Sequence, residues 1–92
     1  MELKDFSVEP CKSRLAFEFL PKKPQELDLA RIAKHLAEYG MEIDVQTTFL
    51  VMAHWNHHGI SMFKSGKIIV KDAQNESEAR KIAQTLIEKM GE

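Results

Sequence analysis

The sequence lacks several features that mark large classes of proteins. It contains a single cysteine, Cys11, among 92 residues, so no disulfide can form within the chain. A lone thiol is typical of a reducing, cytoplasmic setting. No apolar run approaches the roughly 20 residues that span a bilayer, so we expect no membrane association. The opening segment MELKDFSVEP is acidic and interrupted, so we expect no signal peptide.

An excess of charge of one sign is also lacking, because 13 Lys and Arg residues nearly balance 14 Asp and Glu residues. The net charge of −1 excludes a globally basic field, so nucleic-acid binding would depend on a local patch. Ser65-Gly66-Lys67 does not match a phosphate-binding loop, because Ser61 and Ile68 stand where glycine and Ser or Thr are needed. No nucleophile with a base, and no paired carboxylates, can be argued from spacing. We therefore predict no enzyme, no cofactor and no small-molecule substrate.

What is present is the composition of one ordinary globular domain, with 43% hydrophobic and 29% charged residues. We predict a single domain over residues 1–92, in which residues 1–12 form an N-terminal extension, either an added strand or an arm. Residues 14–19 alternate between apolar and other side chains, which indicates a half-buried strand. Residues 29–39 carry apolar side chains at helical spacing, with Asp28 as the N-cap and Gly40 after the last turn.

The second half predicts more strands and a second helix. Residues 42–55 favour one long strand, or two short ones with a kink near Gln46. The segment HWNHHG at 54–59 predicts a turn. Residues 60–64 and 67–71 then predict a hairpin around Ser65-Gly66. Asn75 opens the last helix in a pattern close to a capping box, and Gly91 closes it.

The two apolar helix stripes need a surface to cover, and the sheet supplies it. We predict an α+β fold with a single curved antiparallel sheet and two helices packed on one face. By strand alternation, the opposite face should carry side chains from several strands. These are Arg14, Ala16, Glu18, Ser61, Phe63, Ile69 and Lys71. Phe49, Val51 and Ala53 share one face of their strand, and Leu50 and Met52 take the other. We place Phe49 and Val51 on the open side, which then holds more apolar surface than solvent favours.

The segment FKSGKIIVKDAQNESEARKIA resembles the signature of the TATA-box-binding protein family. It has a strand ending in Phe63, then Ser65-Gly66-Lys67, a second apolar strand, and an acidic, Ala-rich helix start. Upstream, LDLARIAKHLAEY is similar to that family's first helix. The resemblance covers roughly residues 14–90.

The resemblance implies one half of a saddle, whose concave sheet lies on the DNA minor groove in that family. Phe49 and Phe63 would then be the wedges between base steps, and Ile69 and Lys71 would lie on the concave face. Only one repeat is present, so a complete saddle would need a homodimer. Arg14 stands where the family has a base-reading Asn, and the carboxylate of Glu18 would repel phosphates.

We therefore hypothesise a non-enzymatic binding domain that uses the open sheet face. The leading interpretation is homodimer formation or docking of a protein partner, linked to transcription. The alternative is DNA binding by a dimeric saddle. The candidate contact residues on the face are Phe49, Val51, Ser61, Phe63, Ile69, Lys71, Arg14 and Ala16. Lys64 and Lys67 are candidate phosphate contacts, although lysines on hairpins usually protect edges. His54, His57 and His58 are weak metal candidates, because adjacent residues of an extended chain point in opposite directions.

Overall fold

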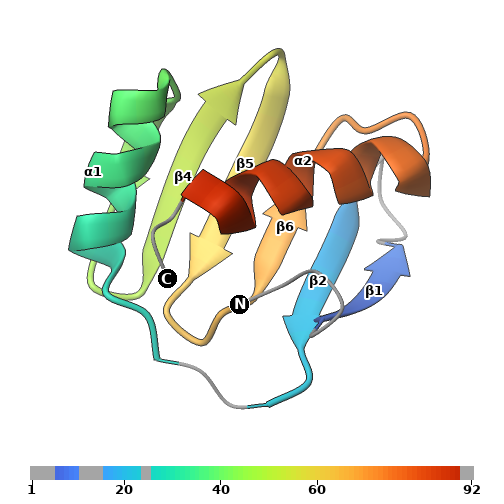
Figure 1. Cartoon of the computed structure of the whole chain (residues 1–92), viewed down its shortest axis with the longest axis horizontal. Helices are drawn as coiled ribbons and strands as arrows, with labels where there is room; N and C mark the ends of the chain where they lie inside the picture. The colour runs from blue at the N-terminus through green and yellow to red at the C-terminus, as the bar shows by residue number, and fades with distance from the viewer. Residues whose placement is uncertain (1–5, 11–15, 24–25, 90–92) are drawn as a thin grey trace.

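A computed structural model of the chain describes residues 6–10, 16–23 and 26–89. Its six strands form one antiparallel sheet, and two helices lie on the same side of it (Figure 1). The elements are β1 (Phe6–Pro10), β2 (Phe17–Pro21), α1 (Leu29–Tyr39), β3 (Glu42–Gln46), β4 (Leu50–Trp55), β5 (His58–Phe63), β6 (Ile68–Val70) and α2 (Glu76–Lys89). None of the described helices is long and apolar enough to cross a membrane.

The order of strands across the sheet is β1-β2-β6-β5-β4-β3. The chain leaves β2, passes through α1 to the far edge, and returns strand by strand until β6 lies beside β2. Helix α1 packs over β3 and β4, and α2 packs over β6 and β2. The predicted fold class, an α+β domain with one curved antiparallel sheet and two helices on one face, is confirmed.

The core fills the space between the sheet and the helices because alternate strand residues point toward the helices. Its fully buried large side chains are Phe19, Val51, Met62, Ile68 and Val70 from the strands and Ile32, Leu36 and Leu86 from the helices. Met62, Ile68 and Val70 face the helices, so Ser61, Phe63 and Ile69 lie on the other side, where strand alternation predicted them.

The helix ends follow the predicted caps. The Asp28 carboxylate accepts a hydrogen bond from the Arg31 N–H at 3.2 Å, which starts α1. Gly40 ends it with a φ of 112°, a left-handed conformation that is strained for residues with a β carbon. Asn75 caps α2 through a 2.8 Å bond that its side-chain oxygen accepts from the Glu78 N–H. The predicted stop at Gly91 lies outside the described residues.

Residues 42–55 form two strands joined by a tight turn. The Thr47 hydroxyl accepts hydrogen bonds from the N–H groups of Phe49 and Leu50, at 3.2 and 3.0 Å, and the Thr47 N–H donates to Leu50 O at 2.8 Å. Such a turn mimics a backbone turn with a side-chain oxygen. The kink expected near Gln46 is therefore a complete reversal of the chain.

This turn corrects the prediction for Val51. Residue 49 belongs to the turn, so strand alternation begins only at Leu50 and does not carry an orientation over from Phe49. Val51 is 1% exposed and packs in the core beneath the helices. Leu50 and Met52 lie on the open side instead, opposite Phe63 and Ser61 of β5.

Several strand ends also differ from the sequence-based expectation. The predicted turn at 54–59 shrinks to Asn56 and His57, which have positive φ angles of 50° and 69°, because β4 and β5 pair up to Trp55 and His58. Strand β2 covers 17–21 instead of 14–19, and β6 covers 68–70 instead of 67–71. Arg14 lies outside the described residues, so its predicted place on the sheet is not described.

Candidate functional site

The sheet surface turned away from the helices is the candidate site, and we call it the open face. Its apolar side chains come from five strands: Leu20 (β2), Ile69 (β6), Phe63 (β5), Leu50 and Met52 (β4), and Val45 (β3). Val45 is 40% exposed and the others are half-buried. None of the described helices covers this side (Figure 1). The open face therefore presents a strip of apolar side chains across five strands of the sheet, as an association surface does.

Two candidate contact residues are buried instead of projecting from the surface. Ser61, on the uncovered side, is 4% exposed, and Ala16, just before β2, is 8% exposed. Ser61 is flanked in the ladder by Met52 and Ile69, whose longer side chains rise on either side of it. A ligand would therefore touch Met52 and Ile69 before it reached Ser61.

Lys67 lies over the open face and is held there by two neighbours. Its Nζ is 3.1 Å from Glu18 Oε1 on β2 and 5.0 Å from the centre of the Phe63 ring. The ion pair and the cation–π contact both orient the ammonium group. Lys67 is thus already paired with a carboxylate of its own chain. Lys71 is exposed, and its aliphatic stem runs over Gly59 at about 3.5 Å from where a Cβ would stand.

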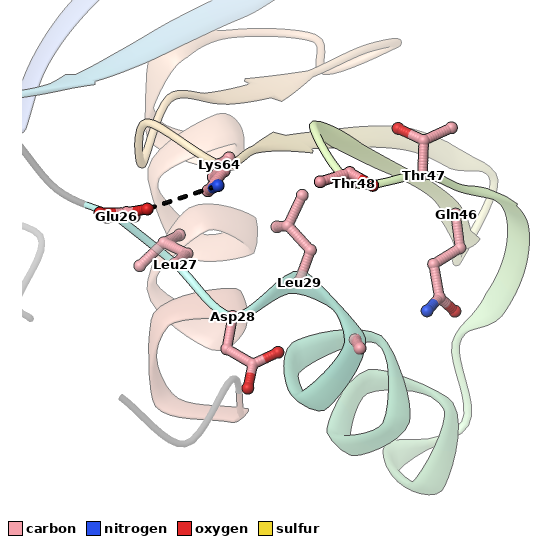
Figure 2. A pocket seen from close by; sticks show the side chains of 9 residues that line it. Glu26, Leu27, Asp28, Leu29, Gln46, Thr47, Thr48 and Lys64 are labelled. Carbon is pink, nitrogen blue, oxygen red and sulfur yellow. Dashed lines mark ion pairs between the residues drawn. The ribbon is translucent and has the colours of Figure 1, made fainter.

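Lys64 is paired in a similar way, at the end of the sheet where α1 begins. Its Nζ is 3.4 Å from Glu26 Oε1, across an open groove of about 660 Å³ (Figure 2). Residues 26–30, the turn residues 46–48 and Lys64 line the groove. The carboxylate of Asp28 in the groove wall caps α1. The groove therefore has one lysine, and a glutamate partly neutralises it.

Carboxylates surround the apolar strip. Glu9 of β1 stands directly opposite Glu18 of β2, and Glu42 of β3 stands opposite His54 of β4. Asp44 pairs with His54 at the bulge in β3. Four carboxylates thus share the face with Lys67 and Lys71, which makes its margin acidic at neutral pH. An acidic margin disfavours phosphate groups and favours basic side chains.

Phe49, the other proposed wedge, lies in the β3–β4 turn at one end of the open face. It is 70% exposed, the largest exposure among the described large hydrophobic side chains. Its carbonyl accepts a 2.9 Å hydrogen bond from the Lys64 N–H, which ties this turn to the β5–β6 turn. Phe63 is nearby, because Leu50 and Phe63 are directly paired. The two phenylalanines therefore belong to one end of the same surface.

The three histidines are not brought together. His54 pairs with Asp44 on the open face, whereas His58 Nε2 is 3.1 Å from Glu78 Oε1 of α2 on the helix side. His57 lies in the exposed turn between them. Among the described residues, no group of three or more His, Cys, Asp or Glu side chains is placed to hold a metal ion.

The sequence reasoning missed Leu20, Val45, Leu50 and Met52 as open-face residues. The pairing of β4 with β5 would have revealed two of them, because Val51 stands opposite the buried Met62. That register is fixed by the two-residue turn at Asn56-His57, which the sequence reading placed within a longer loop.

A family model described as transcription factor TFIID, or TATA-binding protein, matches residues 21–92. The chain belongs to the TATA-binding protein family. The match includes α1, β3 to β6 and α2, and it begins at the last residue of β2. The resemblance found in the sequence is confirmed, and the family is a transcription-related one without enzymatic activity. No curated protein and no solved structure matches the chain.

Proposed function

We propose that this member of the TATA-binding protein family is a non-enzymatic binding domain whose open face docks a protein partner in transcription. One observation carries the proposal: the open face joins an apolar strip to an acidic margin, with its central lysine paired to Glu18. Such a surface suits a partner with an apolar centre and Lys or Arg at its edges.

The physical reason is the distribution of apolar area and charge. Phe63, Leu50, Met52 and Ile69 are half-buried in the isolated chain, so a partner would remove their remaining surface from water at about 25 cal/mol per Å². The aromatic ring of Phe63 lies between Leu50 and Lys67, at the end of the open face that also holds Phe49. Aromatic residues are enriched among the hot spots of protein interfaces.

DNA binding is the alternative, and family membership is the observation that favours it. Phe49 and Phe63 would then wedge between base steps in the minor groove. The pairing of Lys67 with Glu18 and of Lys64 with Glu26 supports it less well, because a phosphate would have to displace a carboxylate at each site. A DNA complex would also show an affinity that falls steeply with salt.

A photoreactive phenylalanine analogue tests which kind of molecule covers the open face. We would place it at Phe63 and, as a matched control, at Tyr39, which is 41% exposed away from the open face. We expect irradiation in cells to give a discrete adduct from position 63, sensitive to protease and resistant to nuclease, and none of that size from position 39. A nuclease-sensitive adduct would favour DNA. An adduct of twice the chain's mass would identify self-association through this face, and the absence of any adduct would refute the proposal.

A further inference from the structure

The hydrogen-bond ladder shows which backbone groups of β1 point out of the sheet. The Lys71 N–H donates to Gly59 O at 2.8 Å and the Phe63 N–H donates to Lys67 O at 2.9 Å. Odd-numbered residues of the β6 segment therefore bond to β5. Hydrogen-bonded and non-hydrogen-bonded pairs alternate along an antiparallel ladder. The backbone N–H and C=O groups of Ile68 and Val70 therefore point toward β2.

The same alternation continues across β2 to β1. Phe17 and Phe19 of β2, which pair with Val70 and Ile68, use their backbone groups for hydrogen bonds to β6. The backbone groups of Glu18 and Leu20 therefore point toward β1. Their partners in β1 are Glu9 and Ser7. The backbone N–H and C=O groups of Phe6 and Val8 consequently point away from β2, and no described strand lies on that outer side.

The two outer strands of the sheet differ in their readiness to pair with another strand. β3 is interrupted by a bulge between Ile43 and Val45, and it carries exposed Glu42 and Asp44 there. Bulges and charges are the features that prevent edge pairing. β1 has an unbroken register with β2 over all five of its residues, so β1 is the regular edge.

We propose that a second copy of this chain pairs with the outer edge of β1, antiparallel and about a two-fold axis through Val8. In this register Val8 meets Val8 of the second copy on the helix side, and the backbone of Phe6 stands opposite that of Pro10. Ser7 meets Glu9 of the second copy on the open side, where its hydroxyl can donate to the carboxylate. Pro10 has no N–H, so each Phe6–Pro10 pair forms a single hydrogen bond.

Charge and strand length select this register over its neighbours. A two-fold axis through Glu9 would place the two Glu9 carboxylates opposite each other. An axis through Ser7 would pair only residues 6–8 of the five in β1. Opposed like charges destabilise a strand pair, and an axis between two residues would bring side chains of opposite faces together. The axis through Val8 avoids these problems.

This inference goes beyond the proposed function and does not depend on it, because edge pairing leaves the open face of each copy uncovered. The two open faces would become parts of one longer sheet, with six strands from each copy. The chain would then present a double-width surface to a partner.

Sedimentation equilibrium of the full chain over a wide concentration range tests the inference. We expect a monomer–dimer equilibrium that Ser7→Glu weakens about tenfold, because it adds two opposed carboxylate pairs across the axis. Ser7→Lys should strengthen it, and Ser7→Glu combined with Glu9→Lys should restore it. Ser7 is exposed, and urea unfolding of each variant would show that the monomer is intact.

Hydrogen exchange locates the contact. The amides of Phe6 and Val8 should exchange more slowly at high concentration than at low concentration, and the difference should vanish in Ser7→Glu. Phe63→Ser, which changes the open face, should leave the dimerisation constant unaltered. A wild-type chain that is monomeric throughout would overturn the inference. So would a dimer that Phe63→Ser abolishes and Ser7→Glu does not, and that result would assign self-association to the open face.

Discussion

Lys67 Nζ lies 3.1 Å from Glu18 Oε1, so an ion pair links the β5–β6 turn to β2 across the open face. Lys64 is paired with Glu26 at 3.4 Å. Both groups are partly exposed, so each pair contributes little to stability. Their main consequence is electrostatic: the lysines best placed to meet phosphates already have carboxylate neighbours.

Removing these carboxylates should therefore create affinity for DNA. We expect Glu18→Gln with Glu26→Gln to bind duplex DNA at low salt, with log K falling by about 0.9 per unit of log salt for each lysine that reaches a phosphate. Fluorescence anisotropy of a labelled duplex measures this. The control is Glu38→Gln with Glu88→Gln, which gives the same net charge through exposed residues of the helices. Equal binding by the two double variants would show that net charge alone matters.

Truncation of two neighbouring residues of β5 should lower the free energy of unfolding by very different amounts. Met62 is fully buried, so Met62→Ala should lower the free energy of unfolding by roughly 2–5 kcal/mol. Phe63 is half-buried on the open face, so Phe63→Ala should cost only about 1 kcal/mol, while abolishing the partner adduct formed from a photoreactive analogue placed at Phe49. Urea titration measures both losses. A larger loss for Phe63 than for Met62 would reverse the assignment of the two faces.

The β4–β5 turn stores conformational strain at His57. Asn56 and His57 both have positive φ, as in the two-residue turns that favour Asn-Gly. We expect His57→Gly to raise the free energy of unfolding by about 1 kcal/mol, because glycine has no penalty in the left-handed region. His57→Ala keeps the β carbon and should give no such gain. Thermal unfolding compares the two, and equal stabilities would show that the turn is not strained.

The Thr47 hydroxyl should control the position of Phe49. It accepts hydrogen bonds from two N–H groups of the turn, and Thr47→Val removes that acceptor with little change of shape. We expect a loss of about 1–2 kcal/mol and faster amide exchange at Phe49 and Leu50. Thr48→Val is the matched control, since the Thr48 hydroxyl makes no hydrogen bond among the described residues. Similar effects from both variants would contradict the role given to Thr47.

Local patterns predicted much of the fold. The caps at Asp28, Gly40 and Asn75 and the hairpin at Ser65-Gly66 depend on residues a few positions apart. For the same reason, alternation around the hairpin correctly placed Phe63 on the open side. These features need no knowledge of distant parts of the chain.

The remaining features depend on contacts that local patterns do not encode. Val51 was misplaced because the Thr47 hydroxyl accepts the Leu50 N–H in a turn that separates two strands, so alternation could not be extended from residue 49. The pairing of Lys67 with Glu18 arises because β6 lies beside β2 in the sheet, although the two strands are far apart in the sequence. The order of strands, and not the spacing of residues, brings the two side chains together.

The central claim is that the open face serves a protein partner and not DNA. The most direct measurement is a titration of the isotope-labelled wild-type chain with an AT-rich duplex at low salt, following the amide resonances of Ser61, Phe63 and Ile69. We predict that these resonances do not move. Saturable shifts of all three that disappear as salt is added would show DNA on the open face and would contradict the claim.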